Sequence, residues 1–122
     1  IEAAQAGRPL RVFGSGAQTR CFCLVDDAVE ALLRLAALPA AAGEVFNIGG
    51  DEEVSIRELA ERVIAGLGSA SRVELVPYDA AYAPGFEDMQ RRRPALEKLE
   101  RFTGFRPRTP LHEIIRRTAA GA

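Results

Sequence analysis

The chain has 122 residues, 48% of them hydrophobic and 27% charged, which is typical of a soluble globular domain with a modest core. Sixteen basic and seventeen acidic side chains give a net charge of −1, which argues against nucleic acid or a membrane surface as the main partner. No apolar run is long enough to span a membrane, and no charged and apolar leader opens the sequence. Nine basic but only three acidic side chains lie after residue 89, so this end is a candidate anion-binding region.

Glycines and alternating apolar residues organise the first quarter of the chain. Residues 1–7 have the pattern of a helix end closed by glycine, and residues 9–13 alternate as a short strand that stops at Gly14 and Gly16. A second strand is expected over residues 20–25, where β-favouring side chains are frequent.

The next segment predicts a helix that is capped by Asp26 or Asp27, runs to about Leu38 and ends at Pro39. Its residues are apolar nearly all round, so we expect this helix to be well buried. The run from Glu44 to Ile48, before two glycines, has the clearest strand pattern of the chain.

Three further helices and one strand are expected in the second half. Ser55 and Glu58 form a capping box that starts a helix ending near residue 67, and residues 72–76 alternate as a strand. Residues 78–93 predict a long polar loop, which in a small domain is usually functional or disordered. Helices are expected over residues 96–102 and 110–119. Strands that alternate with helices predict an α/β fold, with a small mixed sheet and three to four helices.

The cysteines and the histidine do not predict a metal site. Cys21 and Cys23 lie two positions apart in an expected strand, a separation that is poor for a disulfide. His112 has no cysteine or second histidine near it in the sequence. We therefore expect two core thiols in a cytoplasmic protein without a bound metal.

A motif at residues 12–27 resembles the substrate-side motif "VxGxGxQTRxFxxVxD" of extended short-chain dehydrogenases/reductases. These are the NAD-dependent nucleotide-sugar epimerases, dehydratases and decarboxylases, and the likeness includes UDP-glucuronate decarboxylases. Nine residues match in order: Val12, Gly14, Gly16, Gln18, Thr19, Arg20, Phe22, Val25 and Asp27. In that family the motif begins the half of the enzyme that holds the nucleotide diphosphate of the sugar.

Two features of the complete family are missing from these 122 residues. Its catalytic couple Tyr-x-x-x-Lys is absent, because Pro94 stands four positions before the one lysine, Lys98. There is also no glycine-rich loop to cradle a dinucleotide pyrophosphate. The resemblance implies that residues 1–122 are the C-terminal, substrate-binding portion of such an enzyme, without its NAD-binding Rossmann domain.

The family resemblance also implies a cofactor and partners. The complete enzyme would use NAD, whereas this chain would carry no catalytic residue and bind no cofactor. Its partners would be a nucleotide-sugar substrate and the N-terminal NAD-binding domain of the same polypeptide, in a homodimer.

Two arginines are candidates for the diphosphate. Arg20 lies in an expected strand among buried-looking neighbours, so it either pairs with Asp26 or Asp27 or binds an anionic ligand. The family resemblance favours phosphate. Arg92 aligns with an arginine of the family's "RRxPD" run that reaches the substrate diphosphate, although a solvated basic loop is the alternative.

Other candidates follow from the same resemblance. Leu10, Val12 and Phe13 correspond to the segment that holds the uracil or thymine ring, although Phe13 could equally be core. Asp88 or Glu87 could accept hydrogen bonds from the ribose hydroxyls. The sequence thus predicts a substrate-binding fragment that holds a UDP- or dTDP-sugar. The alternative is a stand-alone, non-catalytic nucleotide-binding or interaction module.

Overall fold

The computed structural model describes residues 1–80 and 88–121. The described residues fall into two compact units. Unit 1 comprises Ile1–Arg20, Val54–Arg92 and Ile115–Ala122, and unit 2 comprises Cys21–Glu53 and Arg93–Ile114. Within the described part of the chain, no helix is long and apolar enough to cross a membrane.

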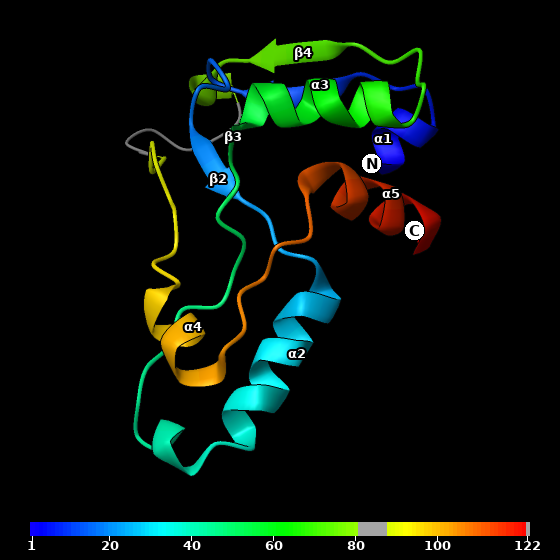
Figure 1. The fold of residues 1–122 in the computed structure, drawn as a ribbon. Coiled ribbons are helices and arrows are strands. Elements are labelled where there is room, and N and C mark those ends of the chain that lie inside the picture. The colour runs from blue at the N-terminus through cyan, green and yellow to red at the C-terminus, as the bar shows by residue number, and fades with distance from the viewer. Residues whose placement is uncertain (81–87, 122) are drawn as a thin grey trace. The chain divides into compact units, whose positions relative to one another are not determined.

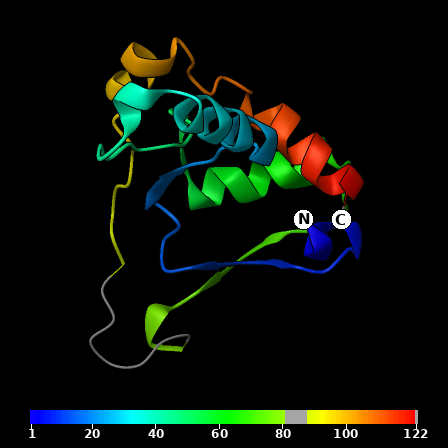
Figure 2. The same cartoon turned by 90° about the horizontal axis from the view of Figure 1, so that it is seen from below.

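Unit 1 is built on a pair of parallel strands covered by a helix. After the short helix α1 (Glu2–Gln5), strand β1 (Leu10–Phe13) pairs in parallel with β4 (Val73–Val76), so that each residue of β1 faces one of β4 in order. Helix α3 (Ile56–Gly66) precedes β4 in the chain and packs on both strands, and Figures 1 and 2 show it running alongside the strand pair. The buried side chains of this unit are mainly small and apolar: Ala4, Val12, Val54, Ala60, Val63, Val76 and Ile115.

A second strand pair leads into α3. Strand β2 (Thr19–Cys21) pairs with β3 (Glu53–Ser55), and α3 begins directly after β3. Ser55 is the N-cap of α3, and its hydroxyl accepts a hydrogen bond of 3.1 Å from the Glu58 backbone N–H. This is the serine half of the expected capping box. The Glu58 carboxylate instead accepts a bond of 2.7 Å from Arg62.

Unit 2 is held by two helices and a basic side chain. Helix α2 (Val25–Ala36) packs on α4 (Glu97–Thr103), and Leu96 and Leu99 are fully buried. A 3-10 turn, η1 (Pro39–Ala41), follows α2.

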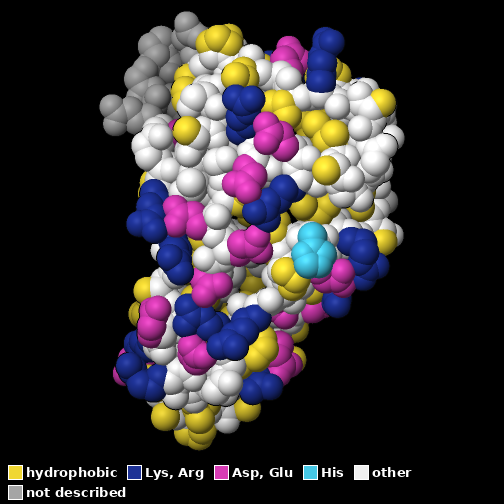
Figure 3. All heavy atoms as spheres, turned by 45° about the horizontal axis from the view of Figure 1, so that its top comes forward, with side chains coloured by type: hydrophobic (Ala, Val, Ile, Leu, Met, Phe, Trp, Pro, Cys, Tyr) yellow, Lys and Arg dark blue, Asp and Glu magenta, His cyan; other side chains and the backbone are white. Residues whose placement is uncertain are grey.

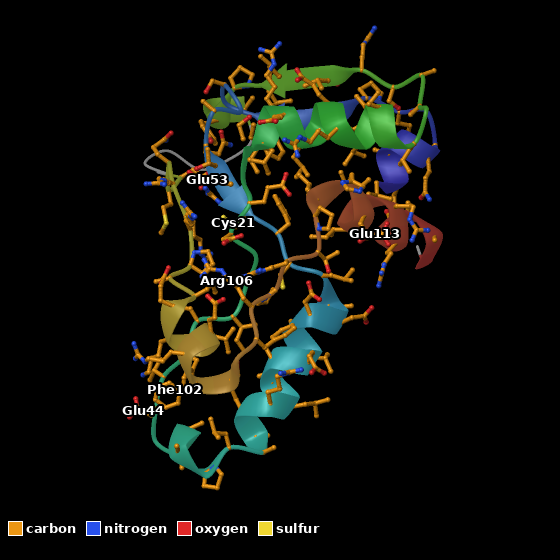
Figure 4. All side chains as sticks on the ribbon, viewed as in Figure 1. Cys21, Glu44, Glu53, Phe102, Arg106 and Glu113 are labelled. Atoms are coloured by element: carbon orange, nitrogen blue, oxygen red, sulfur yellow. The ribbon has the colours of Figure 1, made fainter. Side chains whose placement is uncertain are left out.

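The basic side chain of unit 2 is Arg106. It donates to Asp51 at 2.8 Å and to Glu100 at 2.9 Å, and Figure 4 shows it near the start of α4. The last helix, α5 (Leu111–Gly121), begins in unit 2 and continues in unit 1. Near its start, the Leu111 backbone N–H donates to Glu52 at 2.9 Å.

The ion pairs of Arg106 predict a dependence of stability on pH. Hydrogen bonding to Arg106, with a smaller contribution from Arg108, lowers the pKa of Glu100 from its ordinary value of 4.5. Because the folded carboxyl is the stronger acid, its contribution is complete above pH 4.5 and is lost as the pH falls below that value. Arg106→Ala should therefore weaken the dependence of the unfolding free energy on pH between about 5 and 3. Arg93→Ala, at an exposed site, is the control. Equal pH profiles for the two variants would contradict the assignment.

Most expected elements are confirmed, including the α/β class. Among the described residues the strands form two pairs, β1 with β4 and β2 with β3. The expected strand over residues 20–25 is wrong at its end, since β2 stops at Cys21 and Val25 already begins α2. The N-cap of α2 is Leu24 rather than an aspartate. The aspartates lie in the first turn of α2, where negative charge is favoured by the helix dipole.

Two expectations about unit 2 are wrong. Residues 44–48 are not a strand, because no described residue pairs with them. Helix α2 is not well buried: only Ala31 is buried, and a whole side of the helix is exposed. Both errors concern features that depend on another segment: a strand needs a second strand to pair with, and an apolar helix face needs a surface that covers it.

Candidate functional site

The candidate site begins where a distant segment joins β2. The Thr19 backbone N–H donates to the Gln90 carbonyl at 2.8 Å, and the Arg92 N–H donates to the Thr19 carbonyl at 3.3 Å. Thr19 and Arg91 thereby form an isolated parallel bridge within unit 1. The arginine run, some seventy residues further along the chain, thus lies beside β2.

This bridge determines which faces the two candidate arginines, Arg20 and Arg92, share. Successive side chains of extended backbone point to opposite faces. Because Thr19 is bridged to Arg91, the residues that follow them, Arg20 and Arg92, are the pair expected on the other face. Arg92 is exposed, and its side chain makes no hydrogen bond or ion pair with another described residue. It therefore remains available to an anionic ligand.

Arg20 is held firmly in the structure. Its Nη2 lies 2.6 Å from Asp88 Oδ1, and its Nη1 donates at 2.7 Å to the carbonyls of both Thr19 and Met89. The side chains of Arg20 and Asp88 are only 22% and 23% exposed. The alternative in which Arg20 pairs with Asp26 or Asp27 is wrong, since the acid that pairs with Arg20 is Asp88.

Tyr78 completes this cluster and was not predicted as part of a site. Its hydroxyl donates to Asp88 Oδ2 at 3.3 Å, so one carboxylate accepts from both Arg20 and Tyr78. Tyr78 belongs to the 3-10 turn η2 (Tyr78–Ala80) after β4. The family motif gave no signal for it, because its contacts form only when β4 pairs with β1.

The Tyr78 ring is positioned by a glycine. Gly14 has a φ of +67°, and a Cβ atom there would overlap the ring. Gly14→Ala should thus cost more unfolding free energy than the roughly 1 kcal/mol of left-handed strain alone. Gly68→Ala is the control, since Gly68 has a φ of +58° with open space around it. Denaturant unfolding of both variants checks this, and equal costs would contradict a role for the Tyr78 contact.

The base-binding candidates lie along β1. Val12 is 2% exposed, so its side chain belongs to the core of unit 1. Leu10 and Phe13 are half-buried, and the Arg11 guanidinium lies 5.7 Å from the Phe13 ring centre. The Phe13 carbonyl accepts a bond of 3.2 Å from the buried Gln18 side chain. Leu10 and Val12 lie on one face of the strand and Phe13 on the other, so a ring held at the end of β1 would meet the Phe13 side chain rather than that of Val12.

Other candidates contribute little to this cluster. Glu87 lies outside the described residues. Burial raises the pKa of the Cys23 thiol, and Asp27 raises it further, so this thiol stays protonated near neutral pH. No group of three or more metal-ligating side chains occurs among residues 1–80 and 88–121.

On the face drawn in Figure 3, Lys and Arg side chains are interspersed with Asp and Glu. The three consecutive arginines at residues 91–93 are all exposed. They are the exposed basic run next to the cluster of Arg20, Asp88 and Tyr78.

Several known proteins are similar to this chain in sequence. Residues 1–49 match the family model described as the NAD dependent epimerase/dehydratase family. The UDP-N-acetyl-alpha-D-glucosaminuronate decarboxylase of Bacillus cytotoxicus is 39% identical over 119 residues, which are 97% of this chain and 36% of that protein. The UDP-glucose 4-epimerase of Mycolicibacterium smegmatis is 35% identical over 117 residues, 96% of this chain and 35% of that protein.

A solved structure extends the similarity to the fold. An epimerase from Methanothermobacter thermautotrophicus superimposes with a TM-score of 0.85 at 25% identity, covering 98% of this chain and 34% of that one. The fold and the motif are those of extended short-chain dehydrogenases/reductases, over about a third of the length of such enzymes. The chain belongs to the NAD-dependent epimerase/dehydratase family, and it spans about a third of the length of the relatives it matches.

Proposed function

We propose that this chain is the C-terminal, substrate-binding portion of an NAD-dependent nucleotide-sugar epimerase, dehydratase or decarboxylase. It would hold the nucleotide diphosphate of a UDP- or dTDP-sugar. The observation that carries the proposal is the parallel bridge between Thr19 and Arg91, because it brings the segments of Arg20 and Arg92 together. Guanidinium groups suit a diphosphate, since each can donate two hydrogen bonds to phosphate oxygens.

Each residue of the cluster has a role in this proposal. Arg92 is exposed and would bind a phosphate directly. Arg20 would donate its remaining N–H groups to the diphosphate while Asp88 keeps its head in place at 2.6 Å. Asp88 could also accept a bond from a ribose hydroxyl, and Phe13, at the end of β1, would pack against the base.

The long helices of this chain do not suit the pyrophosphate of NAD. A dinucleotide site uses a glycine-rich loop and the unpaired N–H groups of a helix N-terminus. Helices α2, α3 and α5 all carry acidic side chains in their first turns, which would repel a pyrophosphate. We therefore place NAD, which would take hydride from the sugar, in an N-terminal domain of the same polypeptide. The complete enzyme would be a homodimer, without nucleic acid or membrane as a partner.

Within that enzyme this chain would supply binding and positioning rather than proton or hydride transfer. Binding energy from the nucleotide, remote from the reacting carbon, holds the sugar against the cofactor and so supports the chemical step. A titration of the complete polypeptide with UDP-glucose, dTDP-glucose, UDP and glucose 1-phosphate tests this function. We expect the nucleotide ligands to bind and glucose 1-phosphate to bind far more weakly. Failure of all nucleotide ligands to bind would overturn the proposal.

A further inference from the structure

One face of strand β1 carries an aromatic side chain and an exposed basic side chain. Side chains alternate along a strand, so Arg11 and Phe13 share the face opposite to that of Val12. Val12 is buried, whereas Arg11 is exposed and Phe13 is half-buried. The Arg11 guanidinium lies 5.7 Å from the centre of the Phe13 ring, so the two side chains do lie on the same side of the strand.

The neighbouring strand adds an acidic side chain to this face. In the register of the two parallel strands Arg11 is paired with Glu74 of β4, and residues paired in this way point to the same face of a sheet. Glu74 is also exposed. Within residues 1–80 and 88–121, neither side chain makes an ion pair or a side-chain hydrogen bond. A guanidinium donor and a carboxylate acceptor therefore stand on neighbouring strands and are available to a ligand.

The order of these residues along the strands follows the order of the parts of a nucleotide. The cluster of Arg20 and its partners lies at the C-terminal end of the strand pair, because Tyr78 follows β4 and a Cβ atom at Gly14 would overlap its ring. Phe13 is the last residue of β1, and Arg11 lies about 7 Å farther from the cluster along the strand. A nucleotide that binds Arg20 through its diphosphate and stacks its base on Phe13 would direct the far edge of that base toward Arg11.

The chemistry of this far edge differs between the pyrimidine bases. Uracil and thymine offer a carbonyl oxygen, O4, next to the N3–H group, so an acceptor stands beside a donor. This pattern is complementary to a guanidinium beside a carboxylate. Cytosine carries an amino group and an unprotonated ring nitrogen at the same positions, so each protein group would meet its own kind. A site that pairs with one pattern rejects the other, because polar groups would lose their partners on binding.

We propose that Arg11 and Glu74 select the base of the nucleotide. Arg11 donates to O4 of uracil or thymine, and Glu74 accepts a hydrogen bond from the N3–H group beside it. The inference rests on the proposed function and extends it, because it assigns recognition of the base to two side chains that lie outside the family motif at residues 12–27.

A comparison of UDP-glucose with CDP-glucose tests this proposal, because the two ligands differ only at this edge of the base and carry the same charge. Isothermal titration of the complete polypeptide should give at least about tenfold tighter binding of UDP-glucose. Arg11→Ala should weaken binding of UDP-glucose by about tenfold and leave binding of CDP-glucose nearly unchanged. Glu74→Gln should strengthen binding of CDP-glucose, because an amide can also donate to the cytosine ring nitrogen.

Two further variants separate base recognition from charge and structure. Arg8→Ala removes an exposed arginine that precedes β1, and it should leave the preference for UDP-glucose unchanged. Arg11→Lys keeps a cationic donor and should retain part of the preference. A structural or long-range electrostatic role of Arg11 would instead change the binding of both ligands to the same extent, since their sugar and diphosphate are identical.

Two outcomes would overturn the proposal. The first is equal binding of UDP-glucose and CDP-glucose to the unaltered polypeptide. The second is a preference for UDP-glucose that is unchanged in Arg11→Ala. Both results differ from a failure of the proposed function, in which neither nucleotide-sugar binds.

Discussion

Arg20→Ala and Arg92→Ala should each weaken binding of a UDP-sugar to the complete polypeptide by about ten- to a hundredfold. Each variant removes charge-assisted hydrogen bonds to the diphosphate, which contribute roughly 1.5–3 kcal/mol. Arg92→Lys should restore part of the affinity, because an ammonium supplies the charge but not the planar fork. Isothermal titration of the variants with UDP-glucose is the measurement.

The controls separate ligand contact from local structure. Arg93→Ala removes a neighbouring exposed charge and should have a smaller effect. Arg20→Ala also leaves Asp88 without its 2.6 Å partner, so Asp88→Asn, with Arg20 intact, measures how much that ion pair contributes. The double variant of Arg20 and Arg92 should show coupling, since both would act on one anion. Unchanged affinity in Arg20→Ala would reduce Arg20 to a structural partner of Asp88.

The largest expected loss of stability comes from Leu99→Ala. Leu99 is 0% exposed on the inner side of α4, so truncation removes buried methyl groups and leaves a cavity. Such changes lower the unfolding free energy by about 2–5 kcal/mol. Denaturant unfolding of the 122-residue chain measures the difference.

Leu33→Ala is the matched control for Leu99→Ala. Both residues are leucines in helices of unit 2, but Leu33 is 62% exposed. Its truncation should therefore change the unfolding free energy of this chain by less than about 0.5 kcal/mol. Similar losses for both variants would mean that Leu33 is covered in the 122-residue chain.

Local sequence signals correctly predicted the helices and strands that are determined by residues close together in the chain. Ser55 caps α3 as expected, because a cap depends on one hydroxyl and the N–H groups beside it. Strands β1 and β4 appear where the alternation predicted them, and Gly68 follows the end of α3. These features need no knowledge of the rest of the fold.

The errors arise where the outcome depends on a distant partner. The pattern of residues 44–48 is that of a strand, but a strand forms only when a second one supplies hydrogen bonds. Helix α2 is likewise rich in apolar residues, but Val29, Leu32 and Leu33 are exposed in the described part of the chain. The periodicity of apolar residues indicates which face of a segment can be buried. It does not indicate whether another part of the protein covers that face.

The candidate site also combines residues that local patterns can predict with contacts that depend on distant residues. The motif points to Arg20, whereas Asp88 is a candidate only as an acid of the long loop, and their ion pair joins positions 68 residues apart. No local rule pairs them, and none points to Tyr78, whose position depends on Gly14. The assignment of Arg20, Arg92, Leu10, Val12, Phe13 and Asp88 to a nucleotide-sugar remains a prediction from the family motif.

The ion pair of Arg20 with Asp88 has a consequence for the kinetics of the proposed binding step. Asp88 compensates the charge of Arg20, so Arg20 adds little to the long-range field that an approaching anion experiences. That field comes from the exposed arginines at residues 91–93. The basic run would therefore set the rate of association and its sensitivity to salt, and the half-buried Arg20 would set how long the bound anion stays.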